Sequence, residues 1–354
     1  MKTVVFSGHF RPIKDIKFNN EDDLLFTASV DRTVTLWSTE TNERIGTYSH
    51  DASVNCIMPT PDSKYLISGD SFGSVYIWDV CSGEKITKVP PTDLATITSL
   101  DLGCSDRQIC ATMTGRKKDD PSTPIIFDIE EAIKSKKLSD KGGYESNPDD
   151  FHVTRVVSDT KNKINHTRFI NSNKQLLCSF NDGLVELRDI KENKILKSKY
   201  LHKQNTQIMD LDVSAKGELA LTSGKDSRSV LFDPETLEVL NTFKPENPLR
   251  NINSGKISPL FHTGLPEKDQ LRHCIIGGGQ ESRNVTFTKS NEGGFEVLIY
   301  DMITGEEVGS INGHFSPINS IAISHSGKII VSGGEEATVR FHPLTPEYYM
   351  LKDY

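Results

Sequence analysis

A unit of two short apolar segments separated by a polar turn recurs along the chain. Each copy has an apolar segment, a turn rich in Gly, Asp or Ser, and a second segment that ends on a bulky residue. The five clearest copies cover residues 27–37, 67–79, 178–189, 222–233 and 331–342. In the first copy Val34 and Leu36 alternate with Thr33 and Thr35, which is typical of a β-strand.

Two weaker copies, at residues 125–129 and 297–301, fill the gaps between the clear ones. The bulky position therefore occurs seven times, at Trp37, Trp78, Phe127, Arg188, Phe232, Tyr300 and Phe341. The shortest intervals are about 41 residues, within the range of WD repeats, each of which forms one four-stranded blade. The longer intervals require insertions, and polar segments near 134–151 and 262–272 supply them.

These repeats predict an all-β fold, a seven-bladed WD40 β-propeller that occupies residues 1–354 as a single domain. A lone blade cannot bury both of its faces, so the blades must stack around a ring. The last copy ends near Phe341, one strand short, whereas a strand-like segment lies at residues 2–6. We therefore expect the N-terminal strand to pair into the last blade, which closes the ring and removes exposed sheet edges.

Histidines and carboxylates mark the repeats. In the first unit His9, Asp31 and Trp37 have the spacing of the WD hydrogen-bond network, in which a neutral histidine links a carboxylate to a hydroxyl. His314 opens the last copy in the same way. Six residues before the bulky position, a carboxylate occurs at Asp31, Asp182, Asp226 and Glu335. Phe72 occupies this position in the second copy, so we expect a broken network there. The His/Asp pair recurs in register, which favours a structural over a catalytic role.

Composition narrows the classes of function. The net charge is −8, and nucleic-acid binders usually show a basic excess, so we expect no sequence-specific nucleic-acid binding. No apolar run approaches the roughly 18 residues of a membrane span, and the N-terminal run is too short for a signal peptide. The six cysteines form no C-x-x-C pair. We expect a cytoplasmic protein with reduced thiols and no membrane partner.

Motifs for catalysis and cofactor binding are missing from the sequence, which has no GxxxxGK[ST], HExxH or GxSxG element. The glycine-rich segment 277–280 precedes a Thr/Val-rich strand instead of a helix, so it does not form a phosphate-binding helix terminus. We therefore expect no catalytic residue, no cofactor and no metal. An enzyme is the second class of function, and it would require His, Arg or carboxylate side chains that converge on the central channel.

Residues 277–342 carry a specific family pattern. In order they show a Gly-Gly-Gly-Gln element, a Val/Thr-rich segment, a Gly-Phe-Glu strand, a Glu-Glu-x-Gly turn, the sequence GHFSPIN and an SGGE turn. This pattern resembles the i subunit of eukaryotic translation initiation factor 3. The resemblance includes residues 207–243 and the start of the chain, and it is weakest across 80–165.

The resemblance implies a non-catalytic scaffold subunit of the initiation factor 3 complex. Such a subunit docks subunits b and g and supports recruitment of the small (40S) ribosomal subunit and scanning for the start codon. A helix from the C-terminal region of subunit b is expected to lie against the propeller. The family is also related to a receptor-associated WD adaptor, so the alternative is a signalling adaptor that binds receptor kinases.

Asp210 and Asp226 in the fifth copy match acidic positions of the family pattern and are the candidate partner-binding residues. Asp226 also occupies the network register, whereas Asp210 has no such second role, so Asp210 is favoured. The aromatic segment 346–354 is expected to cover an apolar patch on the propeller, and a partner contact is the alternative.

Overall fold

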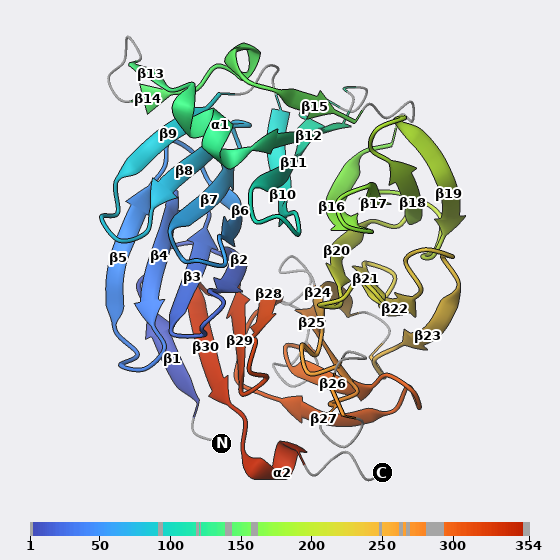
Figure 1. Ribbon diagram of the computed structural model, residues 1–354. Coiled ribbons are helices and arrows are strands. Elements are labelled where there is room, and N and C mark those ends of the chain that lie inside the picture. Colours follow the sequence, from blue (N-terminus) through green and yellow to red (C-terminus); the bar gives the residue numbers. More distant parts are fainter. Residues whose placement is uncertain are drawn as a thin grey trace.

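The recurring apolar segments form strands that assemble into seven sheets around a common axis (Figure 1). This computed structural model describes residues 3–90, 95–117, 120, 122–138, 144–156, 162–247, 250–261, 265–266, 270–280 and 294–349. Each sheet has a core of four antiparallel strands, which we number as blades 1 to 7 from the first complete unit. The arrangement confirms the predicted seven-bladed propeller.

The first four blades follow one another along the chain. Blade 1 contains β2 (Ile13–Phe18), β3 (Leu24–Ser29), β4 (Thr33–Ser38) and β5 (Arg44–Ser49). Blade 2 contains β6 (Val54–Pro59), β7 (Tyr65–Asp70), β8 (Val75–Asp79) and β9 (Lys85–Val89). Blade 3 contains β10 (Ala95–Leu102), β11 (Gln108–Gly115), β12 (Ser122–Asp128) and β15 (Val153–Arg155). Blade 4 contains β16 (Ile164–Ile170), β17 (Gln175–Phe180), β18 (Leu184–Asp189) and β19 (Lys194–Tyr200).

The last three blades complete the ring. Blade 5 contains β20 (Ile208–Val213), β21 (Ala220–Gly224), β22 (Arg228–Phe232) and β23 (Val239–Phe243). Blade 6 contains β24 (Asn251–Ile257), β25 (His273–Gly279), β26 (Val297–Asp301) and β27 (Glu307–Ile311). Blade 7 contains β28 (Ile318–Ile323), β29 (Ile329–Gly334), β30 (Thr338–Pro343) and, from the other end of the chain, β1 (Val4–Ser7).

The two ends of the chain meet in blade 7. Strand β1 pairs antiparallel with β30, with Val4 opposite Phe341 and Ser7 opposite Thr338. In Figure 1 these strands, the bluest and the reddest, lie side by side. The ring of blades is therefore joined by main-chain hydrogen bonds between the first and last strands.

The hydrophobic core lies between blades instead of within them. The buried apolar residues form seven clusters, and each cluster draws its members from two neighbouring blades. Phe6, for example, stacks on Trp37 of blade 1 with ring centroids 5.0 Å apart. Glycines permit this close approach, because a Cβ added at Gly333 of blade 7 would lie 2.7 Å from the Ile13 side chain of blade 1.

Part of the insertion near 134–151 is ordered secondary structure, which the sequence did not predict. It includes the end of α1 (Ile129–Lys134), then β13 (Lys137–Leu138), β14 (Tyr144–Glu145) and a 3-10 helix (Pro148–Asp150). Strand β14 pairs parallel with β9, so an insertion in blade 3 covers the outer edge of blade 2. In the insertion near 262–272, residues 262–264 and 267–269 lie outside the described residues, as does the Val/Thr-rich segment after Gln280.

The C-terminal aromatic segment begins with α2 (Pro346–Tyr349). Tyr348 is buried in the cluster between blades 6 and 7, where its ring meets His273. The Tyr349 hydroxyl donates to the Gly327 carbonyl at 3.0 Å. The expected cover over an apolar patch thus holds for residues 346–349, and residues 350–354 lie outside the described part. No helix in the described ranges has the length and apolar character to cross a membrane.

Candidate functional site

One face of the ring carries the histidine networks, in the loops before the innermost strands and the turns between second and third strands. We call it the network face. His9 Nδ1 lies 2.9 Å from Asp31 Oδ2, and its Nε2 lies 2.8 Å from the Thr27 hydroxyl oxygen. A carboxylate only accepts, so Nδ1 carries a proton, and in a neutral ring Nε2 then accepts from the Thr27 hydroxyl. The Trp37 indole N–H donates to the same Thr27 oxygen at 2.9 Å. The structure thus places His9, Asp31 and Trp37 in one network.

Blade 5 has an equivalent network that the sequence revealed only in part. His202 Nδ1 lies 2.8 Å from Asp226 Oδ1, and its Nε2 lies 3.0 Å from the Thr222 hydroxyl oxygen. The signal for His202 was a histidine at the end of the preceding blade, about twenty residues before a Ser or Thr on the second strand. Asp226 is therefore engaged inside the protein, as its register indicated.

The network of blade 7 corrects one predicted residue. His314 Nδ1 lies 2.8 Å from an oxygen of Glu336, so the carboxylate is Glu336 and the prediction of Glu335 was wrong. The error arose because Phe341 was identified from the sequence as the bulky marker of this copy. His342 occupies that position, since its Nε2 lies 3.3 Å from the Ser332 hydroxyl, as the Trp37 indole lies beside Thr27. Counting six residues back from His342 gives Glu336.

Blades 2 and 4 carry altered networks. In blade 2 Phe72 removes the carboxylate, but His50 and Trp78 both still bind the Ser68 hydroxyl, at 2.7 and 2.9 Å, so the expected broken network is only partly broken. In blade 4 Asp182 accepts from Asn162 and from the Tyr200 hydroxyl instead of from a histidine. At the bulky position of that blade, a buried Arg188 forms an ion pair with Glu186 at 2.7 Å.

The networks shift the pKa values of their titratable groups. Burial opposes ionisation of Glu336, yet hydrogen bonds from His314, the Phe315 N–H and Thr338 lower its pKa to about 2. Asp31 behaves in the same way, and its pKa lies well below the ordinary range. Burial lowers the pKa values of His50 and His342 to about 4, so both rings are neutral at physiological pH.

Around the axis, the innermost strand of each blade has a β-bulge near its start. The shift occurs in all seven innermost strands, β2, β6, β10, β16, β20, β24 and β28. In four blades the bulged residue is an asparagine whose amide donates to a carbonyl oxygen of the next blade. These residues are Asn55, Asn165, Asn253 and Asn319, at 3.0, 2.8, 2.9 and 3.1 Å. The amides join neighbouring blades around the channel.

In blades 1 and 5 the residue after the bulge is an aspartate that accepts from a backbone N–H of the next blade. Asp15 accepts from Ile57 N at 3.0 Å, and Asp210 accepts from Gly255 N at 3.2 Å. These N–H groups lie on free inner edges of sheets, where an unpaired donor would be costly. The acidic residues of the channel therefore satisfy strand edges, a role that periodicity within one blade does not reveal.

Asp210 is accordingly one of the most engaged carboxylates in the molecule. Besides Gly255 N, it accepts from the Ser254 hydroxyl at 2.8 Å and from Lys256 Nζ at 2.7 Å, and its exposed fraction is 8%. Burial opposes its ionisation, but Lys256, His166 and Arg168 hold the pKa of Asp210 well below its usual range. Asp210 lies outside the histidine network, as its register indicated, but Ser254, Gly255 and Lys256 of the next blade engage it instead.

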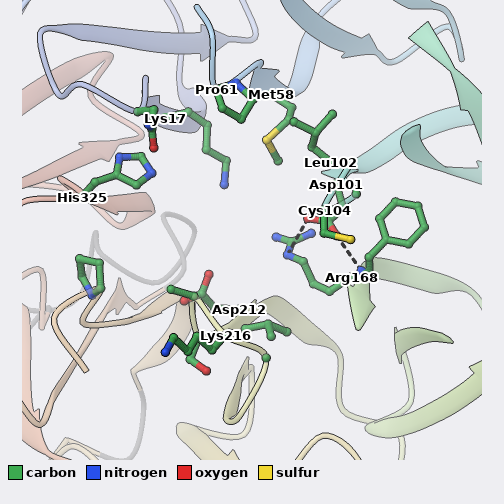
Figure 2. Close-up of a pocket in the computed structure, with 18 of the residues that line it drawn as sticks. Lys17, Met58, Pro61, Asp101, Leu102, Cys104, Arg168, Asp212, Lys216 and His325 are labelled. Carbon is green, nitrogen blue, oxygen red and sulfur yellow. Dashed lines mark hydrogen bonds and ion pairs between the residues drawn. The ribbon is translucent and has the colours of Figure 1, made fainter. Parts of the chain in front are cut away.

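At the opposite face, the channel opens into a cavity of about 670 Å³ lined by the ends of the innermost strands and the turns that follow them. Figure 2 shows Lys17, Arg168, Asp212 and His325 around it, with Arg168 joined to Asp101. Charged groups thus converge on the channel, as an enzyme would require. However, Asp101 accepts from Phe169 N at 2.6 Å, and Asp212 accepts from Ile257 N at 2.9 Å. These carboxylates therefore satisfy backbone N–H groups at strand edges. Within the described ranges, no group of three or more His, Cys, Asp or Glu side chains could hold a metal ion.

Comparison with known proteins gives one consistent result. The family model EIF3I matches residues 1–353. Eukaryotic translation initiation factor 3 subunit I of Taeniopygia guttata is 30% identical over 351 residues, which cover 99% of this chain and 98% of the relative. The proteins of the same name from Homo sapiens and Candida glabrata are 29% and 30% identical, over 99% of this chain and 98% and 95% of their own lengths.

Proposed function

The chain belongs to the EIF3I family, the family of subunit I of eukaryotic translation initiation factor 3; on this premise we propose that it is a non-catalytic scaffold of that complex. In this role it acts in the cytoplasm and docks subunits b and g. Through the complex it supports recruitment of the 40S ribosomal subunit and scanning for the start codon. The observation that carries the proposal is the family match along almost the whole chain.

The architecture supports a docking role. The blades are joined by seven interfacial cores and, at four interfaces, by asparagine amides, so the loops on both faces project from a stiff frame. Loops held in this way lose little conformational entropy when a partner binds. The channel carboxylates described above accept from strand-edge N–H groups, which favours a structural role for them.

For Asp210 and Asp226, contact with subunit b stays a proposal, and the geometry changes how it must be tested. Asp210→Lys would place a second cation against buried Lys256, so a lost interaction would report misfolding. Asp210→Asn and Asp226→Asn keep the shape and remove the charge. If the carboxylates attract a basic residue of subunit b, each variant should bind subunit b more weakly than wild type. The loss should be larger than the decrease in the fraction of folded protein explains. A loss of binding that only follows the folded fraction would contradict the contact.

The scaffold role is tested by affinity purification of the tagged protein from native lysate, followed by mass spectrometry. We expect the subunits of initiation factor 3, b and g among them, at levels absent from a control purification with an unrelated tagged β-propeller. Recovery of receptor kinases without these subunits would establish the adaptor alternative. Recovery of neither would overturn the proposed scaffold role.

A further inference from the structure

The outer strand of blade 4 is uncovered along its whole length. Strand β19 is the last strand of its sheet, so within the described part of the chain one row of its backbone N–H and C=O groups faces no further strand. Among the outer strands that the structure describes it is the longest, at seven residues, and the only one with every residue exposed. Ile195, Leu196 and Tyr200 have exposed fractions of 39%, 42% and 46%. Such an edge is a ready site for another strand.

Blade 2 shows how this fold covers an outer edge. There the insertion of blade 3 runs along β9, with Glu145 of β14 opposite Lys88, and the Ser146 N–H donates to the Lys88 carbonyl at 2.9 Å. The Ser146 hydroxyl lies 2.7 Å from that of Thr87, whose side chain is fully buried. An extended segment thus binds the outer edge of a blade by backbone pairing and by a side-chain contact at this position.

Lys197 on β19 occupies the position that Thr87 has on β9. Each of the two residues pairs with the residue before the bulky position of its blade, Leu187 in blade 4 and Ile77 in blade 2. A segment that lay on β19 as residues 144–146 lie on β9 would therefore place a side chain beside the Lys197 ammonium. A carboxylate is the side chain that complements this ammonium.

The charges near β19 leave this contact open. The strand carries three lysines and no acid. Lys199 Nζ donates to the Leu237 carbonyl of blade 5 at 2.9 Å, whereas Lys194 and Lys197 form no ion pair within the described residues. The exposed acids of the neighbouring turns are Glu192, Glu235 and Glu238. They lie off the strand and pair with neither lysine, so they do not take the place of a carboxylate on an added strand.

We propose that β19 is a docking edge on which an extended segment of a partner protein adds as a fifth strand, with a carboxylate beside Lys197 and apolar side chains beside Ile195 and Tyr200. By register, Ile195 and Tyr200 lie on the opposite side of the strand from Lys197. A second copy of β19 is a poorer occupant, because both strands would bring lysines and no acid. The inference deepens the proposed scaffold role, on which it rests, and it concerns blade 4, whereas Asp210 and Asp226 lie in blade 5.

The test begins with a selection from a random twelve-residue peptide library displayed on phage, with the wild-type full chain as bait. We expect peptides in which apolar residues alternate with polar ones that include Asp or Glu. Leu196→Asp should weaken their binding about tenfold or more. The matched control is Ile45→Asp, because Ile45 is the equivalent bulge residue on β5 and is 56% exposed. Circular dichroism checks that both variants fold, and equal affinities for the two variants would overturn the proposal.

A charge exchange tests the carboxylate. Lys197→Glu should weaken the selected peptides about fivefold or more, since an opposite-charge pair becomes a like-charge pair. Lys191→Glu, in the exposed turn before the strand, makes the same change in net charge and should leave their affinity unchanged. Equal losses in the two variants would show a diffuse electrostatic effect and contradict the assigned contact.

Hydrogen exchange measures whether the peptide adds as a strand. Backbone pairing should slow the exchange of the outward-facing amides of residues 194–200 and leave those of β5 unchanged. In addition, N-methylation of one alternate set of peptide nitrogens should abolish binding, and methylation of the other set should preserve it. A peptide that binds without slowing exchange on β19 would be held by side chains alone, which would overturn the added strand.

Light scattering of the full chain distinguishes a second copy from a partner segment. We expect wild type to be a monomer. A dimer that Leu196→Asp dissociates would place a second copy on β19 and overturn the assignment to a partner.

Failure of this inference is distinguishable from failure of the proposed function. If initiation factor subunits do not co-purify, the scaffold role in translation falls, whatever the peptide selection gives. If they do co-purify but no peptide distinguishes wild type from Leu196→Asp, only the docking edge is wrong.

Discussion

At the scale of single residues, Asp210 shows how a channel carboxylate stabilises the ring. Asp210→Ala removes the nearer ion-pair partner of the buried Lys256 ammonium, which keeps only Asp212 at 3.6 Å, and it leaves Gly255 N without an acceptor. We expect a loss of about 3–5 kcal/mol in the free energy of unfolding, measured by urea denaturation. The exposed Asp149→Ala is the control and should change it by less than about 0.5 kcal/mol. Asp210→Ala/Lys256→Met should recover part of the loss, and a single variant as stable as wild type would contradict the assignment.

The network carboxylate of blade 7 gives a pH-dependent prediction. Since the folded pKa of Glu336 is about 2 and its ordinary value is 4.5, its stabilising contribution is complete above pH 4.5 and is lost as the pH falls toward 2. Glu336→Gln should lower the free energy of unfolding by about 1.5–3 kcal/mol at pH 7. The difference between the variant and wild type should decrease as the pH falls from 4.5 toward 2. Denaturation at several pH values measures it. A larger effect from Glu335→Gln would restore the original sequence assignment.

Individual residues could be predicted where one repeat contains the whole interaction. His9, Asp31 and Trp37 lie within 29 positions of one another, so their spacing reveals their contact. The spacing gave the wrong carboxylate in blade 7 because the apolar Phe341 was identified as the marker instead of its neighbour, His342. It also failed for Asp210, because the partners of this side chain belong to the next blade, more than forty residues away along the chain.

At the scale of elements, strand β1 joins the two ends of the chain. Phe6 is 3% exposed and packs on Trp37 and Phe341. Phe6→Ala should lower the free energy of unfolding by about 3–5 kcal/mol, because it empties the core at the closing interface. Val5→Ala on the same strand is the control, since its side chain is 45% exposed and its removal should cost far less. Equal stability of the two variants, measured by chemical denaturation, would show that β1 does not stabilise the ring.

The strands of the blades could be predicted because they alternate apolar and polar residues and recur. The predicted bulky positions lie on third strands, where they pair with the second strand of the same blade, although the marker on β30 is His342 and not Phe341. The hairpin of β13 and β14 could not be predicted. Its segment is polar and shows no period, and its order comes from pairing with β9, a strand of another blade.

At the scale of the whole molecule, buried histidines make stability depend on pH. His50 and His342 have folded pKa values of about 4, whereas an unfolded histidine titrates near 6.5, so only the unfolded chain takes up these protons between the two values. The free energy of unfolding should be greatest above pH 6.5. It should fall by about 1.4 kcal/mol per pH unit for each such histidine as the pH is lowered to 4.

This loss can be measured by chemical denaturation at pH 7, 6, 5 and 4. His50→Gln should reduce the slope by the contribution of one histidine. An identical slope in wild type and His50→Gln would contradict the assignment of a neutral buried ring.

The number of blades could be predicted from the repeat count, but the location of the core could not. Alternation shows that each strand has a buried side, yet it does not show which neighbour covers it. Here each buried cluster is formed by residues of two neighbouring blades, so no single blade contains a core of its own.

The pairing of β1 with β30 also affects folding during synthesis of the chain. A ribosome makes the chain from its N-terminus, so Val4 emerges long before its partner Phe341 exists. At about 5–20 residues per second, the first strand waits on the order of tens of seconds with its edge uncovered. During that interval blade 1 also lacks the neighbour that buries Trp37. The nascent chain is therefore most prone to misassembly near its N-terminal strand, where a chaperone would give the greatest benefit.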